Sequence, residues 1–364
     1  MFKFLSVAFV FLVTLTNYTP FIPIAIVVAL ILLVKRVSFS KVEIALYLSL
    51  MFAFSIDMTR AFYSSFYEVD VRHIVALLFS VSVFFILLSV YKKERDVTIF
   101  NYAVKVALII HVSFWIVQVF FLYGFSYHID PIEYFIGYEQ RIWGPKLFGV
   151  TIYRASGFAN EPSGYAITIA PLIYLLFLFK KRIDKWTILA LLTMILTFSP
   201  LAWILVFGFF IFVILQKKSF SLKGVLKTTV LLSPILYLVL EYLLWRFADG
   251  KDASLSVRQY AVSWWMSQNE FRQLIGSGFG VNDCGCLVAD SSLYFNLFFT
   301  YGVFSLPFFI LPLFLGRWKI GATFYIYVLM FAKYHFYFLI LWFFLAGARI
   351  NIKCSSSNNS GKLS

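Results

Sequence analysis

The chain has 364 residues, of which 62% are hydrophobic and only 13% are charged, and its formal net charge is +14. Soluble domains carry roughly 25% charged residues, so this composition argues against a soluble protein and predicts an all-α, polytopic membrane protein. The basic residues form short clusters between apolar runs, which is the pattern that orients membrane proteins. We therefore expect membrane lipid, and not nucleic acid, to surround or bind this chain.

The apolar runs are long enough to predict about 12 transmembrane helices, since a bilayer core needs about 20 apolar residues per helix and somewhat fewer near snorkelling side chains. Some divisions between spans rest on turn signals such as Ser199-Pro200, because proline disfavours helix in the preceding residue. The predicted spans are approximately 2 to 17, 20 to 34, 42 to 59, 73 to 91, 97 to 125, 163 to 179, 186 to 199, 200 to 215, 225 to 243, 292 to 315, 320 to 333 and 335 to 349.

Charge predicts how these spans are oriented, because lysine and arginine gather on the cytoplasmic side. With both termini in the cytoplasm, the cytoplasmic segments hold 20 basic and 4 acidic side chains. The longer loops at about 60–72, 126–162 and 244–291 hold 9 basic and 11 acidic side chains and face outward. We predict one integral membrane domain over 1–354, with extracytoplasmic function, and a disordered cytoplasmic tail over 355–364.

The first long outer loop ends in R-A-S-G-F-A-N-E-P-S-G-Y, which begins at Arg154 and places Glu161 directly before an apolar run. Charges at a bilayer edge are costly unless they are paired, hydrated or used, so this pair is a candidate functional site. Arginine presents a planar set of donors to phosphate, and a carboxylate can accept a hydroxyl proton. Because Pro162 suits the first turn of a helix, Glu161 has two open interpretations, a site residue or an electrostatic helix cap.

The second long outer loop contributes one arginine and one carboxylate to the same hypothesis. We predict an interfacial amphipathic helix over about 257–272, capped by Ser254 or Ser256. Arg258, on the first turn of this helix, is the best phosphate ligand of the loop. Asp290 directly precedes the next span, and it has the same two interpretations as Glu161.

The sequence offers no pattern for a metal or a cofactor. The four histidines, at positions 73, 111, 128 and 335, lack metal-binding spacing. The three cysteines form neither a disulfide framework nor a zinc-site spacing. We therefore predict that the site works without a metal ion and without a cofactor.

The order and spacing of several segments resemble the O-antigen polymerase (Wzy) family, within the O-antigen ligase and polymerase superfamily. These segments are R-A-S-G-F-A-N-E-P-S in the first long loop, L-T-F-S-P-L-A-W at 196–203, and S-V-R-Q-Y, G-S-G-F-G and D-S-S-L-Y-F-N-L-F-F-T-Y-G in the second loop and the span after it. The ligase branch usually has a histidine near the position of Asp290, and this departure favours a polymerase. Pro200 stands where many relatives carry arginine, so no function is transferred to that turn.

The resemblance implies a metal-independent glycosyltransferase of the membrane-embedded GT-C class in the bacterial cytoplasmic (inner) membrane. The donor would be a growing glycan on undecaprenyl pyrophosphate, and the acceptor a single lipid-linked repeat unit. Arg154 and Arg258 would bind the donor pyrophosphate, while Glu161 or Asp290 would orient or deprotonate the acceptor hydroxyl. A ligase-type transferase and a lipid-linked oligosaccharide flippase or transporter stay open as alternatives. The sugar, the kind of polysaccharide and the binding of a chain-length regulator protein also stay open.

Overall fold

The computed structural model of this chain is mainly helical, at about 80%, so the predicted all-α class is confirmed. The strands that it contains are short and pair in twos. The residues that the structure describes are 2–15, 28, 41, 44, 47–48, 68–69, 71–147, 150–216, 237, 253–279, 292–315, 320–334 and 339–360.

Most of the apolar runs form helices, which satisfy backbone N–H and C=O groups within a single segment. The helices are α1 (Phe2–Thr14), α4 (Val71–Val90), α5 (Glu94–Phe125), α6 (Pro131–Ile136), α7 (Pro162–Lys180), α8 (Lys185–Leu196), α9 (Pro200–Gln216), α11 (Ala253–Met266), α12 (Glu270–Ile275), α13 (Leu293–Tyr301), the 3-10 helix η2 (Gly302–Ser305), α14 (Leu306–Leu315), α15 (Ile320–Met330) and α16 (Leu339–Ser360). The strands are β1 (Glu68–Val69), parallel to β4 (Gly278–Phe279), and β2 (Trp143–Leu147), antiparallel to β3 (Val150–Tyr153).

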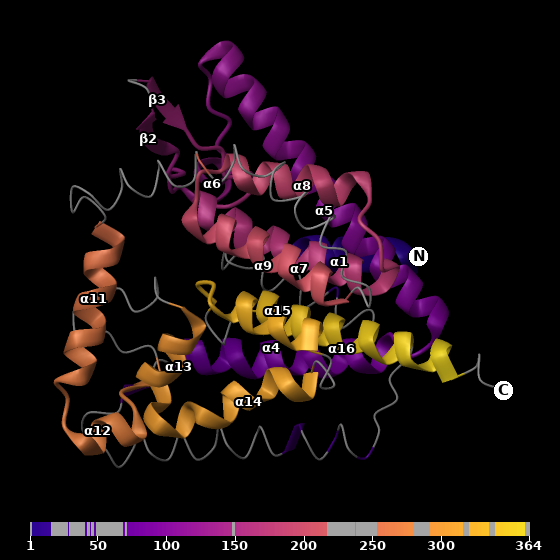
Figure 1. The fold of residues 1–364 in the computed structure, drawn as a ribbon, viewed down its shortest axis with the longest axis vertical. Helices are drawn as coiled ribbons and strands as arrows, with labels where there is room; N and C mark the ends of the chain where they lie inside the picture. The colour runs from indigo at the N-terminus through magenta and orange to yellow at the C-terminus, as the bar shows by residue number, and fades with distance from the viewer. Residues whose placement is uncertain are drawn as a thin grey trace.

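Helix α7 lies among helices from both halves of the chain and is buried along almost its whole length (Figure 1). The Tyr174 hydroxyl of α7 donates a hydrogen bond to the Ala322 carbonyl of α15 at 2.9 Å. From the other direction, the Tyr334 hydroxyl donates to the Ile167 carbonyl of α7 at 2.6 Å. A helix that is apolar on every side is stable only when other helices surround it. Glu161, which directly precedes α7, is therefore held close to several other elements.

One end of the helix packing gathers segments that the charge pattern assigns to the cytoplasmic side. The Tyr91 hydroxyl, after α4, donates to Ser6 Oγ of α1 at 2.8 Å. The carboxamides of Asn101 in α5 and Asn351 in α16 exchange two hydrogen bonds, at 2.8 and 3.1 Å. Because these buried amides satisfy each other, they fix the register of two helices that are far apart in the sequence.

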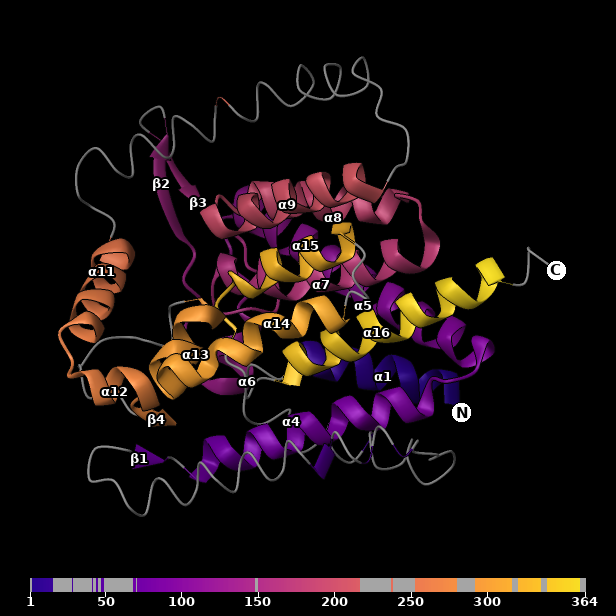
Figure 2. The same cartoon turned by 60° about the horizontal axis from the view of Figure 1, so that its bottom comes forward.

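The opposite end gathers the segments that the charge pattern places outside. The Trp115 indole N–H, in the second half of α5, donates to the Ala155 carbonyl at 2.9 Å, and the Leu293 amide of α13 donates to the Ala332 carbonyl at 3.1 Å. Figures 1 and 2 show α6, β2, β3, α11 and α12 on one side of the molecule, and the start of α1 and the end of α16 on the other. These contacts join the first long loop to α5, and the start of α13 to the turn after α15.

Two of the described helices are long and apolar enough to cross a membrane, Arg95–Phe125 and Pro162–Lys180. Six other described apolar helical stretches have 10–17 residues, and two of them, Val75–Val90 and Leu339–Asn351, are parts of the longer helices α4 and α16. At 1.5 Å per residue, such stretches are shorter than the roughly 30 Å hydrocarbon core. The predicted spans 20 to 34, 42 to 59 and 225 to 243 lie almost entirely outside the described residues. The helical class of the chain is therefore shown, whereas about 12 spans remain a proposal.

The predicted span 292 to 315 is not one helix, because η2 separates α13 from α14. At this break Gly302 adopts a φ of +57°, and a Cβ there would lie 2.2 Å from the Gln273 carbonyl oxygen. Only glycine suits this conformation at such a close approach. The apolar run concealed the break, since hydropathy does not report contacts with a distant backbone.

The single helix predicted over 257–272 is also wrong, because two helices, α11 and α12, occupy this stretch. Asn269 separates them, and its side chain caps α12 by accepting a hydrogen bond from the Arg272 amide at 2.8 Å. The predicted caps Ser254 and Ser256 lie inside α11, because this helix already begins at Ala253. Asparagine is as good a cap as serine, so local sequence alone did not select the boundary.

The tail predicted to be disordered from residue 355 is helical as far as Ser360. Helix α16 begins well before this segment and is buried from Leu339 through most of its first turns. Once a helix is nucleated, each further residue adds one backbone hydrogen bond at little cost. The packed part of α16 thus explains why a small, polar sequence continues as helix.

Candidate functional site

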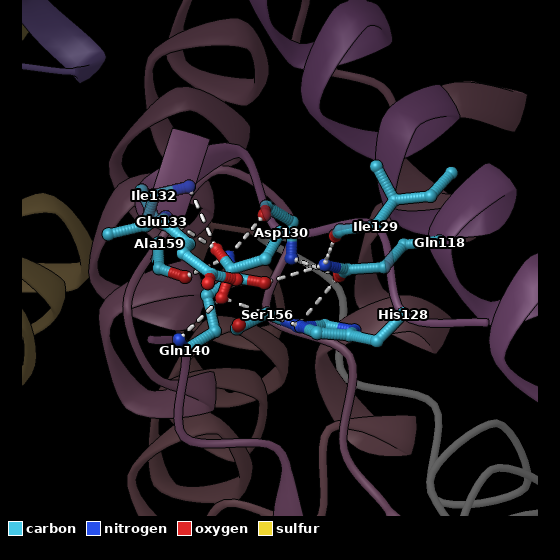
Figure 3. A network of polar contacts seen from close by, with 10 residues as sticks. Gln118, His128, Ile129, Asp130, Ile132, Glu133, Gln140, Ser156 and Ala159 are labelled. Carbon is cyan, nitrogen blue, oxygen red and sulfur yellow. Dashed lines mark hydrogen bonds and ion pairs between the residues drawn. The ribbon is translucent and has the colours of Figure 1, made fainter. Parts of the chain in front are cut away.

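Gln118, near the end of α5, holds the first long loop together (Figure 3). Its Nε2 donates to the Ile129 carbonyl at 2.8 Å and to Gln140 Oε1 at 2.7 Å. Its Oε1 accepts hydrogen bonds from the backbone amides of Ser156 at 3.0 Å and Gly157 at 2.8 Å. Because the Gln118 side chain is fully buried, these bonds replace those that water would otherwise make.

Gln140 and Asp130 extend this network through the loop. Gln140 Nε2 donates to the carbonyls of Gly157 at 2.8 Å and Ala159 at 2.6 Å. Asp130 accepts from the first backbone amides of α6 and, through its second carboxylate oxygen, from the Gln140 amide at 2.7 Å. The loop is therefore a shaped support with its own internal hydrogen bonds, and Asp130 serves that support.

Arg154 and Glu161 are held by the same short segment, Arg141 to Ile142. The Arg154 amide donates to the Ile142 carbonyl at 2.7 Å, and the Arg141 amide donates to the carbonyl of Asn160 at 2.8 Å. The antiparallel pairing of β2 with β3 continues from this point. The structure thus brings the arginine and the glutamate of the sequence motif against neighbouring residues of one strand-like segment.

Glu161 sits between two cations at the start of α7. Lys333 Nζ lies 3.1 Å from Glu161 Oε1, and Arg141 Nη1 lies 4.0 Å from Glu161 Oε2. The Ser163 hydroxyl also donates to Glu161 Oε1. The side chains of Glu161 and Lys333 are 22% and 16% exposed, whereas that of Arg141 is 77% exposed. The pair with Lys333 is therefore the shielded one, and the contact with Arg141 lies at the surface.

These contacts bear on the two interpretations of Glu161 that the sequence left open. Glu161 does occupy the N-cap position of α7, and Pro162 follows it in the first turn. Its side chain, however, makes no capping hydrogen bond to the helix backbone. An electrostatic cap needs no such bond, but the carboxylate is aimed at Lys333, Arg141 and the Ser163 hydroxyl. The geometry favours a charge cluster over a simple helix cap.

The charge cluster also sets the protonation of Glu161. Burial alone raises the pKa of its carboxyl, but the Lys333 ammonium, the Ser163 hydroxyl and the Arg141 guanidinium together hold that pKa below its usual range. Opposite charges within about 4–6 Å favour the ionised form of a carboxyl. Glu161 is therefore ionised at neutral pH in this arrangement, and a carboxylate with a lowered pKa is a weak base.

The turn that carries Lys333 is fixed by two other elements. On one side, the Tyr334 hydroxyl bonds the Ile167 carbonyl of α7. On the other side, the Leu293 amide at the start of α13 bonds the Ala332 carbonyl at 3.1 Å. The beginnings of the helices that follow the two long loops, α7 and α13, therefore meet at the turn after α15.

Lys333 is the residue that sequence reasoning missed, because it is simply the last residue of the predicted span 320 to 333. A signal was present: the predicted topology places this lysine on the outer side, away from the cytoplasmic segments that hold most of the basic residues. Arg141 lies in the predicted outer loop at 126–162, where its local sequence indicates no role. Both are brought to Glu161 only by the tertiary structure.

The other half of the predicted site is not placed. Arg258 lies in the first part of α11, but its side chain is outside the described part of the structure. Helix α11 itself packs through Ala261 and Trp265 against Phe299 of α13. Asp290 lies outside the described residues, three positions before Leu293. The expected convergence of Arg258 and Asp290 on Arg154 and Glu161 therefore stays a prediction.

Comparison of this chain with known protein families, with curated proteins and with solved structures finds no match. The resemblance in the sequence therefore stays a prediction. Within the described residues, no group of three or more histidine, cysteine, aspartate or glutamate side chains is arranged to hold a metal ion. The site is defined by its cations and one carboxylate.

Proposed function

We propose that this protein is a polysaccharide polymerase of the bacterial cytoplasmic membrane. It would join oligosaccharide repeat units carried on undecaprenyl pyrophosphate, by metal-independent glycosyl transfer at the outer face. The product would be O-antigen, capsule or exopolysaccharide. The observation that carries the proposal is the cluster of Arg141, Glu161 and Lys333, located where the R-A-S-G-F-A-N-E-P-S motif meets α7.

The arrangement of helix ends supports the membrane part of this proposal. The helices that follow the two long loops, α7 and α13, begin at one end of the molecule, while α1 begins and α16 ends at the other (Figures 1 and 2). The chain as a whole has a mean hydropathy of +0.87, typical of proteins that expose apolar surface to lipid. A site at the first end would face lipid-linked substrates outside the cytoplasm.

The chemistry of the cluster supports the glycosyl-transfer part. Departure of the lipid pyrophosphate builds negative charge, which arginine and lysine donors stabilise. Arg154 and Arg258 are the proposed ligands of that group. Glu161 and Asp290 are the carboxylates proposed to orient or deprotonate the acceptor hydroxyl.

Loss-of-function variants test the proposal in cells that lack the chromosomal copy. We expect Arg154→Ala, Arg258→Ala and Glu161→Gln to insert stably and to lose the ladder of long glycan chains. Glu133→Gln, in the same loop, and Arg95→Ala, at the opposite end, are controls that exchange exposed charges and should keep the ladder. A normal ladder in all three test variants contradicts the proposal.

The glycan that accumulates in a null strain separates the alternative functions. Single repeat units on lipid at the outer face are expected for a polymerase. Finished polymer held on undecaprenyl pyrophosphate indicates a ligase instead. Repeat units trapped at the cytoplasmic face indicate a flippase or transporter.

A further inference from the structure

We propose that Lys333 is an additional ligand for the anionic pyrophosphate of the donor, and that pyrophosphate binding takes this lysine from Glu161 and frees the carboxylate to receive the acceptor proton. The inference rests on the polymerase proposed above and deepens it. It assigns to Lys333 a direct contact with substrate. The ion pair between Glu161 and Lys333 is then the state without substrate, and substrate binding breaks it.

The charges of the cluster suit an anionic ligand. Glu161 carries one negative charge, whereas Lys333 and Arg141 both carry positive charge and both face it. Lysine and arginine side chains are common ligands of phosphate groups, so two of them that face one carboxylate can also bind an anion. Arg141 is largely exposed and lies 4.0 Å from the carboxylate, a loose contact that leaves its planar donors to a ligand.

The backbone around Lys333 is fixed, whereas its ammonium group can change partner. Its neighbours Ala332 and Tyr334 are bonded to α13 and α7, so the backbone of this turn is held in place. The ammonium itself is carried on a flexible four-carbon stem with three rotatable donors. Lys333 can therefore exchange a carboxylate for a phosphate oxygen without movement of the helices, and it stands where the helices after both long loops begin.

The chemical step then balances. The acceptor oxygen forms a bond to the anomeric carbon of the donor as the bond from that carbon to the pyrophosphate oxygen breaks. The bonding electron pair leaves with the pyrophosphate, whose added charge Lys333 and Arg154 neutralise. The acceptor hydroxyl proton passes to the Glu161 carboxylate, so that no further reactant is needed.

The protonation of Glu161 follows the same exchange. In the resting cluster, burial raises the pKa of this carboxyl while Lys333, Ser163 and Arg141 lower it more strongly. When pyrophosphate takes Lys333, the main lowering interaction is lost and burial remains. The pKa of Glu161 then rises, and the carboxylate becomes a stronger base at the moment when a proton must be accepted.

Binding of undecaprenyl pyrophosphate to the purified full-length protein in detergent tests the inference. We expect Lys333→Gln to weaken binding roughly tenfold, as removal of one charge-assisted hydrogen bond does. We expect Glu161→Gln to strengthen binding, because this substitution removes the group that competes for Lys333. A purely structural ion pair predicts weaker or unchanged binding for both variants, so binding by Glu161→Gln that is weaker or unchanged overturns the inference.

Controls separate a local effect from misfolding. Lys180→Gln breaks another lysine–carboxylate pair, with Asp184 at 2.9 Å, at the opposite end of the molecule and should leave binding unchanged. Lys333→Arg keeps the charge and should restore most of the affinity. If Lys333→Gln does not fold, the Glu161→Gln arm still decides, since weaker binding in that variant contradicts competition for the lysine.

Two further experiments identify which anion binds. They also distinguish failure of this inference from failure of the proposed function. Inorganic pyrophosphate should compete with the lipid if the cluster reads the phosphates, and undecaprenyl monophosphate should bind more weakly. Binding that ignores all Lys333 and Glu161 variants overturns the inference even if the polymerase is correct. Variant-sensitive binding with an unchanged glycan ladder overturns the polymerase and keeps the anion site.

Discussion

Lys333 Nζ lies 3.1 Å from Glu161 Oε1, although 172 residues separate the two along the chain. This contact joins the turn after α15 to the residue that directly precedes α7. Glu161 is therefore half of an ion pair that lies where α7, α13 and the turn after α15 meet.

The Glu161 pair should stabilise the protein in a pH-dependent manner. The pKa of Glu161 is lower in the folded protein than in the unfolded chain, where a glutamate titrates near about 4.3. Its contribution is therefore complete above that pH and is lost as the pH falls through the lower, folded pKa. At pH 7 we expect Glu161→Gln to unfold more easily by about 1–2 kcal/mol, a difference that shrinks below pH 4. Thermal unfolding in detergent across this range measures it, and a constant difference at every pH contradicts the prediction.

Gln118 should be essential for the shape of the first long loop. Gln118→Ala leaves two backbone amides, two carbonyl-type acceptors and a buried space without their partner, and each buried unsatisfied group costs about 1–3 kcal/mol. We expect faster limited proteolysis between α5 and α7 and a lower unfolding temperature. Gln259→Ala, at an exposed position of α11, is the matched control and should behave like the parent protein.

Gly302 should not accept a side chain. Its φ is +57°, and a Cβ would lie 2.2 Å from the Gln273 carbonyl oxygen, so Gly302→Ala must move the backbone of α12 or of η2. We expect a loss of at least about 1–3 kcal/mol in unfolding free energy. Gly124→Ala is the control, because nothing lies within 4 Å of a Cβ in that part of α5. An alanine in a helix is favoured over glycine, so Gly124→Ala should be neutral or stabilising, and equal effects of the two substitutions contradict the structure.

The proposed orientation in the membrane should be visible with reporter fusions. Alkaline phosphatase needs disulfides that form only outside the cytoplasm, so a fusion after Tyr138 should be active. A fluorescent protein fused after Arg182, between α7 and α8, should fold and fluoresce in the cytoplasm. Exchange of the two reporters should abolish both signals. An active phosphatase after Arg182 would reverse the proposed orientation.

Local features of the chain were predicted well where a residue acts through its own backbone. Proline places the break between α8 and α9, because it disfavours helix in Ser199. Pro162 lies in the first turn of α7, and Gly157 adopts a φ of +61°, both as their types indicate. None of these assignments depends on which helices pack together.

Features that depend on distant contacts were missed. Gly302 interrupts an apolar run because of its close approach to Gln273, and Glu161 pairs with Lys333, which lies 172 residues further along the chain. Neither contact is visible in the local sequence around these positions. Their conformation and contacts depend on residues that are distant in the sequence.

Apolar runs and prolines were sufficient to predict a helical chain and a charged motif directly before α7. They were not sufficient to pair Glu161 with Lys333 and Arg141. Periodicity and propensity act over a few residues, whereas that pairing requires α7, α13 and the turn after α15 to meet. Burial of apolar surface is non-directional, so it drives helices together without naming partners. Specific hydrogen bonds, such as that from Tyr334 to Ile167, then select one arrangement, and they exist only once the chain has folded.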